Sequence, residues 1–173
     1  MAVIGELFTK PVVILGCGNT LLGDDGFGPE VIEHLHKHYK IPENVLAMDA
    51  GTSAGDILFD FVLSPVRPRR LFIVDAVASG GVEPGEIFEI PVERVPEGGT
   101  GGFTPHQVPS MSLLRELKFS AGVDVRILAV RAVIVPEFVQ PGLSPEVRAA
   151  VDRACAWLFR QIGEAPGGCR SKE

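Results

Sequence analysis

Two of the short runs of four consecutive apolar residues constrain the fold more than any other feature of this chain. They lie within residues 11–16 and 70–75, and a glycine ends the first while a carboxylate ends the second. A strand that is apolar on both faces is typical of a parallel sheet buried on both sides. Parallel strands need long crossover connections, which are usually helices. The sequence therefore predicts a sheet with helices on both faces.

Segments with helical spacing alternate with these strand-like runs. Further strands are expected at residues 45–48, 86–92 and 123–135, and helices at 26–39, 56–63, 110–117 and 144–162. Such alternation predicts an α/β fold, a three-layer sandwich with a mostly parallel twisted sheet and helices on both faces. Residues 1–162 are expected to form a single domain, and residues 163–173 a flexible C-terminal tail.

The bulk composition narrows the function classes. The net charge is −6, so the sequence offers no broad basic surface for nucleic acid. There is no secretory signal pattern, and no apolar run approaches the roughly 20 residues that cross a bilayer. Three cysteines without a CxxC pair suit a reducing compartment. We therefore expect a cytoplasmic protein that binds neither nucleic acid nor membrane.

Three carboxylates are expected at one edge of the predicted sheet. Asp25 follows the first strand, Asp49 ends the second and Asp75 ends the third. In open α/β sheets, ligands bind beyond the carboxyl ends of the strands. Each acid also has an ordinary interpretation, because Asp25 could cap a helix and Asp75 could stabilise a turn.

The glycine-rich segment 16–28 has two interpretations. Its first glycines resemble a dinucleotide fingerprint, with Asp49 in the place of the acid that holds a ribose. However, Leu21 replaces the third glycine, and Asp24 and Asp25 would repel a phosphate at the helix entrance. We therefore favour a role for these glycines in a tight turn that lets the backbone approach closely.

A histidine could complete a metal site with two of these acids. His106 follows a glycine-rich stretch, although a lone loop histidine is more often an ordinary surface residue. Asp25, Asp75 and His106 together would suit a divalent transition metal with open coordination positions. His34, His36 and His38 are interpreted as a solvated helix face, and Cys17 as a small turn residue.

An ordered series of motifs resembles the hydrogenase maturation proteases, the endopeptidases that trim nickel–iron hydrogenase large subunits. The motifs lie at residues 16–28, 49–52, 74–76, 105–107, 136–137 and 142–144. The resemblance implies that Asp25, Asp75 and His106 are both the metal-binding and the catalytic residues. In many members of the family the first of these acids is glutamate, whereas this chain has aspartate.

The resemblance also implies a substrate and a metal. The partner would be a nickel–iron hydrogenase large-subunit precursor, which loses its C-terminal extension after nickel insertion. The nickel would be supplied by the substrate, and zinc or cadmium could substitute for it. Asn19, Asp49, Gly51 and Thr52 would line the substrate groove. Independently of the resemblance, the four glycines within residues 98–102 predict a loop that could serve as a lid. We expect the protein to be a monomer.

Two points about function stay open at the level of sequence. A non-catalytic nickel-site checkpoint or chaperone for the large subunit would use the same three ligands. The identity of the hydrogenase that is processed is also open. The segment after His106 favours the group that reduces a deazaflavin coenzyme in methane-producing archaea.

Overall fold

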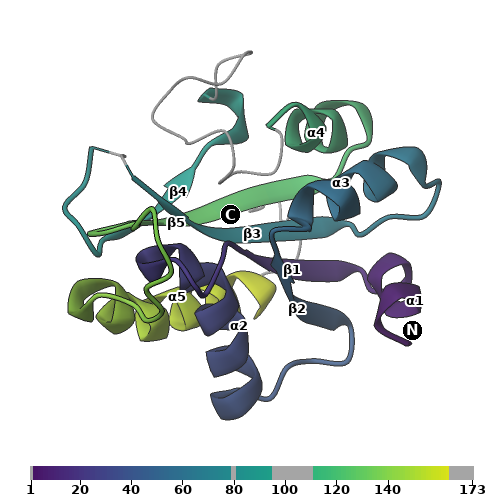
Figure 1. Cartoon of the computed structure of the whole chain (residues 1–173). Coiled ribbons are helices and arrows are strands. Elements are labelled where there is room, and N and C mark those ends of the chain that lie inside the picture. The colour runs from purple at the N-terminus through teal and green to yellow at the C-terminus, as the bar shows by residue number, and fades with distance from the viewer. Residues whose placement is uncertain (1, 79–80, 95–110, 164–173) are drawn as a thin grey trace, which may run out of the picture.

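The computed structural model describes residues 2–78, 81–94 and 111–163, and it shows an α/β fold (Figure 1). Its five strands are β1 (Val12–Cys17), β2 (Val45–Gly51), β3 (Arg70–Val77), β4 (Ile87–Ile90) and β5 (Asp124–Arg131). Its α-helices are α1 (Ala2–Thr9), α2 (Phe27–His38), α3 (Ala54–Leu63), α4 (Met111–Arg115) and α5 (Pro145–Gly163). Short helical turns add η1 (Gly23–Gly26), η2 (Val92–Arg94) and η3 (Glu116–Ser120). The predicted fold class is confirmed.

The strands form one sheet in the order β2-β1-β3-β5-β4. All pairs are parallel except β4 with β5, and β4 lies at one edge. The predicted edge strand at 86–92 therefore exists, although it is shorter. The two fully apolar runs became the central strands β1 and β3, and every residue of both is buried.

Helices cover both faces of the sheet, which gives three layers (Figure 1). One face packs against α2 and α5, and the other packs against α3 and α4. Side chains alternate along each strand, so neighbouring residues contribute to opposite cores. Leu15 and Ile73 belong to the core beneath α3, while Ile14 and Phe72 belong to the core beneath α2.

The structure adds a helix that the sequence analysis does not predict. Helix α1 precedes β1 and buries Leu7. The ring of Phe8 also lies edge-on to that of Phe61 in α3, with centroids 5.5 Å apart. A short N-terminal helix of this kind is stabilised mainly by packing, because isolated helices of this length are marginal in water.

The predicted strand at 123–135 is wrong in length, because β5 ends at Arg131. Beyond it the backbone N–H groups of Val133 and Ile134 donate to the carboxylate of Asp24 instead of continuing a ladder. The sequence pattern stays apolar through this turn, so periodicity alone does not reveal where the strand ends. Strands β2 and β3 run two residues beyond Asp49 and Asp75, so neither acid is the last residue of its strand.

Two further expectations concern the ends of the chain and the membrane. Helix α5 closes the described part of the domain at Gly163, and the rest of the predicted tail lies outside the described residues. Within the described ranges, none of the helices combines the length and apolar character that spanning a bilayer requires.

Candidate active site

The glycine-rich segment brings η1 against the ends of β1 and β3. Gly18 has φ +120°, and a Cβ there would lie 1.8 Å from the carbonyl oxygen of Asp25. A Cβ on Gly28 would lie 2.3 Å from the carbonyl oxygen of Cys17 and 2.5 Å from that of Val74. Only glycine permits such approaches. The close backbone approach predicted for these glycines is therefore confirmed.

Asp24 is wholly buried and joins three stretches of chain. Its Oδ2 accepts hydrogen bonds from the N–H groups of Val133 (2.8 Å) and Ile134 (3.0 Å). Ser144 donates to the same carboxylate through its N–H, at 2.6 Å, and its hydroxyl, at 3.0 Å. Helix α2 has no side-chain cap, so the alternative in which Asp24 and Asp25 cap this helix is wrong. Asp24 instead fixes the loops beyond the strands.

Asp25 differs from its neighbour in what surrounds it. Its Oδ2 accepts a hydrogen bond from the N–H of Asn19 at 2.9 Å, and its carbonyl oxygen accepts from the same N–H at 3.2 Å. The side chain is nearly buried, with 7% of the residue exposed. Because η1 packs against β3, this carboxylate is held beside the end of the sheet.

Asp75 is more deeply buried than Asp25. It has no exposed surface, and it pairs with Ala129 of β5 across the parallel ladder. Oδ1 accepts a hydrogen bond from the N–H of Ala76 at 2.8 Å, while Oδ2 has no partner among the described residues. A buried polar atom without a partner is rare and costly, so it marks a candidate functional site.

Burial raises the pKa of Asp75 well above its ordinary value, against the opposing effect of the hydrogen bond from Ala76. The negative charge of Asp25 raises that pKa further, so the two carboxylates influence each other electrostatically. Both acids therefore lie at this edge of the sheet, and their joint role in binding a metal stays a prediction.

Cys17 lies among the same carboxylates. Burial raises the pKa of its thiol well above the ordinary value, and the charges of Asp75, Asp49 and Asp25 raise it further. A nucleophilic cysteine needs the opposite environment, with nearby positive charge that favours the thiolate. Cys17 therefore stays a thiol, and its surroundings do not favour a Cys–His mechanism.

The histidine of the predicted metal site lies outside the described residues, as does the predicted lid at 98–102. Within the described ranges, no three His, Cys, Asp or Glu side chains are placed so that they could hold a metal ion. The described part of the chain therefore offers two adjacent carboxylates, one of them with an unpartnered oxygen.

The predicted groove residues cluster beside this site. The N–H of Gly18 donates to the carbonyl of Gly51 at 3.1 Å, and Asp49 Oδ1 accepts from the N–H of Gly51 at 2.8 Å. Asn19 contacts Asp25 as described, and Thr52 lies in the exposed turn after β2. The structure therefore places all four around the ends of β1 and β2.

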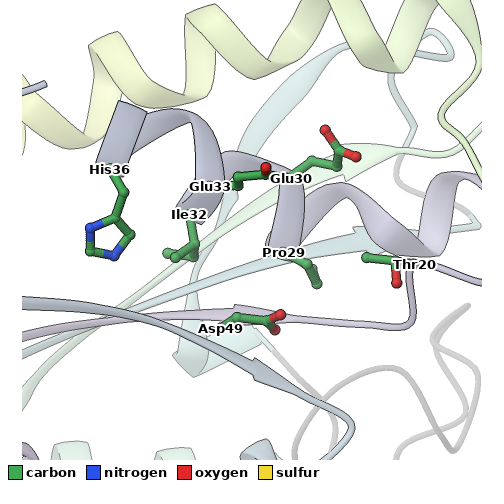
Figure 2. A pocket seen from close by; sticks show the side chains of 7 residues that line it. All are labelled: Thr20, Pro29, Glu30, Ile32, Glu33, His36 and Asp49. Atoms are coloured by element: carbon green, nitrogen blue, oxygen red, sulfur yellow. The ribbon is translucent and has the colours of Figure 1, made fainter. Parts of the chain in front are cut away.

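A pocket of about 400 Å³ opens between α2 and β2 (Figure 2). Its lining comprises Thr20, Pro29, Glu30, Ile32, Glu33, His36 and Asp49. Sequence reasoning singled out only Asp49 as a binding residue. His36 is exposed as predicted, but its Nε2 also lies 2.9 Å from the carbonyl oxygen of Ala47. The sequence did not mark Glu30 and Glu33 of α2 as binding residues, because charged residues on an exposed helix face are common.

Comparison with known proteins shows which family this chain belongs to. A family model described as hydrogenase maturation protease matches residues 29–161. This chain belongs to the hydrogenase maturation protease family. The chain is also 36% identical, over 155 residues, to a Methanocaldococcus jannaschii protein described provisionally as such a protease. That match covers 88% of this chain and 97% of the relative.

Two further relatives extend the comparison to a hydrogenase subunit and a solved structure. The chain is 35% identical to coenzyme F420 hydrogenase subunit delta of Methanothermobacter thermautotrophicus, over 90% of this chain and 97% of the relative. It resembles the hydrogenase maturating endopeptidase HybD from Escherichia coli with a TM-score of 0.67 and 30% identity. That likeness covers 89% of this chain and 94% of HybD. The chain is therefore a hydrogenase maturation endopeptidase.

Proposed function

We propose that this protease removes the C-terminal extension of a nickel–iron hydrogenase large subunit after nickel insertion. We further propose that Asp25, Asp75 and His106 contact the nickel of the precursor. The observation that carries the proposal is the buried Oδ2 of Asp75, which has no hydrogen-bond partner among the described residues and feels the charge of a second carboxylate, Asp25. Two carboxylates and an imidazole suit a divalent transition metal and leave positions open for substrate groups.

The chemistry of the two acids supports contact with a cation. Each negative charge makes the other less favourable, as the raised pKa of Asp75 indicates. A divalent cation would relieve that repulsion and supply the missing partner of Asp75 Oδ2. Zinc or cadmium would satisfy the same oxygen ligands in place of nickel.

The residues of the proposed site have different roles in cleavage. When bound, the metal of the precursor polarises a carbonyl oxygen or lowers the pKa of a water. Asp75 holds its position through the hydrogen bond from Ala76 and through complete burial. Asp25 is the more accessible carboxylate and orients the attacking water, while the N–H of Asn19 fixes one of its oxygens.

Exposed apolar side chains near η1 support a polypeptide substrate. Leu21, Ile134, Phe138 and Val139 are 48%, 46%, 69% and 68% exposed, respectively. They lie on two loops that are joined where the N–H of Gln140 donates to the carbonyl of Leu21 at 2.8 Å. Exposed apolar groups that gather in one area are typical of surfaces that bind other proteins.

The decisive experiment is mass spectrometry of a nickel-loaded precursor before and after incubation with this protein. The wild type is expected to release a C-terminal peptide, and Asp25→Asn, Asp75→Asn and His106→Ala are expected not to. Circular dichroism would check that each variant is folded. A precursor that binds tightly but keeps its full mass would refute cleavage and favour the checkpoint role.

We propose a coenzyme F420-reducing hydrogenase as the client. The support comes from the relative that is named as the delta subunit of such an enzyme, together with the sequence after His106. We also propose that the protease acts in the cytoplasm as a monomer, because its partner is the precursor itself. Comparing cleavage rates of nickel-loaded precursors from different hydrogenase classes would test the choice of client.

A further inference from the structure

The lining of the pocket between α2 and β2 includes neither Asp25 nor Asp75. Its lining includes three acids and one histidine, and no lysine or arginine. We propose that this pocket binds a lysine or arginine side chain of the polypeptide substrate, a few residues from the bond that is cut. The inference deepens the proposed function and rests on it, because it assumes that a polypeptide crosses this edge of the sheet.

The charge of the lining favours a cation. Glu33 Oε1 lies 2.5 Å from the Nζ of Lys37, and Glu30 Oε2 lies 3.0 Å from the Nη1 of Arg148. Asp49 Oδ1 accepts a hydrogen bond from the N–H of Gly51. Among the described residues, the second oxygen of each carboxylate has no hydrogen-bond partner. A cation in the pocket could therefore bind these oxygens without breaking an existing contact.

The three acids do not contribute equally. Figure 2 shows Glu30 directed away from Asp49, and its ion pair with Arg148 draws it towards α5. Among the described residues Glu33 forms an ion pair with the exposed Lys37 of its own helix, and the charge of Arg148 has a smaller effect on its pKa. Exposed pairs of this kind contribute little stability. Asp49 and Glu33 are therefore the carboxylates available to a ligand.

The apolar part of the lining favours an organic cation over a bare metal ion. Pro29 and Ile32 are buried residues of α2 that project towards β2 (Figure 2). Lysine and arginine bury their methylene stems along such surfaces while the charged group stays near water. Within the described residues, no group of His, Cys, Asp and Glu is arranged to hold a metal ion.

Hydrogen bonds connect the pocket to the candidate active site. Thr20 follows Asn19, whose N–H donates to Asp25 Oδ2 at 2.9 Å. On the other side, Gly51 links Asp49 to Gly18 through its N–H and its carbonyl. These short links put the pocket next to the candidate site in the chain, and an extended substrate advances about 3.3 Å per residue, so the proposal assigns the pocket to a residue near the cleaved bond.

A binding experiment with short peptides tests the pocket without requiring catalysis. The probe is a five-residue peptide, acetylated and amidated, with a central arginine between glycine and alanine residues. A second peptide with norleucine at the centre keeps the apolar stem and removes the charge. NMR titration up to about 10 mM peptide should shift the amide signals of Thr20, Ile32 and Asp49 with the arginine peptide only.

Variants make the assignment specific. The double variant Glu33→Gln with Asp49→Asn keeps the shapes of both side chains, and the asparagine oxygen can still accept from Gly51. It should weaken peptide binding at least fivefold. Asp60→Asn, on an exposed position of α3 across the sheet, removes one charge and should leave binding unchanged. Equal binding of the norleucine peptide, unchanged binding by the double variant, or no shifts at the lining residues would overturn the proposal.

Cleavage kinetics give a second measurement on the full system. With the nickel-loaded precursor, the double variant should raise KM at least fivefold and leave kcat within about twofold, because the pocket contributes binding and not chemistry. A lowered kcat with unchanged KM would also contradict the proposal. Failure of the wild type to cut any precursor would refute the proposed function, whereas the peptide titration would still report on the pocket.

Discussion

Two wholly buried aspartates lie at the carboxyl edge of the sheet, and they differ in their hydrogen bonds. Asp24 accepts four hydrogen bonds from Val133, Ile134 and Ser144. Asp75 accepts one, from Ala76, and its second oxygen has no partner among the described residues. Burial is equal at the two sites, at 0% exposure. The number of donors is therefore what separates a structural carboxylate from one that is available for chemistry.

The same comparison explains why η1 carries two acids in succession. Asp24 holds the loop after β5 and the start of α5 against η1, and this fixes the backbone on which Asp25 sits. Asp25 is then held beside Asp75 without needing a cation for its own position. Asp24, which accepts four hydrogen bonds, thus helps to position Asp25 near Asp75. Mutations at Asp24 and at Asp75 should therefore affect different measurable quantities.

The largest expected effect is the loss of processing in Asp75→Asn. Asparagine has nearly the same shape but no negative charge, so we expect cleavage of a nickel-loaded precursor to fall by about 10³-fold. The free energy of unfolding should not fall, because the change removes a desolvated carboxylate that is incompletely paired. Rates of peptide release and urea denaturation measure the two quantities. A clear loss of stability would mean that Asp75 is structural and would remove the contrast with Asp24.

Asp24→Asn should have the opposite signature, with a large effect on stability. Whichever way the amide is turned, its NH₂ group faces a donor that now has no acceptor. We expect the free energy of unfolding to fall by about 3 kcal/mol, because breaking a buried charged network costs this much. For a domain of this size the loss corresponds to a Tm that is lower by roughly 6–12 °C. Calorimetry would measure it, and a Tm unchanged from the wild type would refute the structural role.

Sequence reasoning located this edge of the molecule because its signals are local. The apolar runs at β1 and β3 require burial on both faces, and the acids that follow them must then lie at one edge. Gly18 and Gly28 could be anticipated for the same reason, since tight backbone approach excludes a side chain.

The role of Asp24 could not be found in this way. Its donors lie about 110 and 120 residues further along the chain, and the sequence does not show which loop will return to it. Val133 and Ile134 look like strand residues, although the structure uses their N–H groups for Asp24. The α2–β2 pocket was missed because Glu33 and His36 are ordinary residues of an exposed helix until β2 is placed opposite them.

The pH dependence of stability should distinguish Asp75 from the other acids. Its pKa is raised in the folded state by burial, so the folded protein holds this proton at pH values where the unfolded chain releases it. Above a pH of about 3.9 the unfolded chain releases the proton of Asp75, while the folded protein keeps it. The free energy of unfolding contributed by Asp75 therefore falls as the pH rises, until the pH passes the pKa of Asp75 in the folded state. Without metal, the stability of Asp75→Asn relative to the wild type should increase between pH 4 and pH 7. A difference that stays constant over this range would show that the pKa of Asp75 is not raised.

The smallest expected effect lies at Ser144, and it tests whether the Asp24 network depends mainly on backbone donors. The hydroxyl of Ser144 donates to Asp24 Oδ2 at 3.0 Å and also accepts from the N–H of Val147, at 3.4 Å, near the start of α5. Ser144→Ala removes both contacts but keeps the N–H that donates to Asp24 at 2.6 Å. We expect a loss of about 1 kcal/mol in the free energy of unfolding, with kcat unchanged. Ser144→Thr keeps the hydroxyl and should recover most of that loss. If Ser144→Ala were as damaging as Asp24→Asn, the side-chain donor would dominate the network, and the backbone donors would contribute little to holding η1 in place.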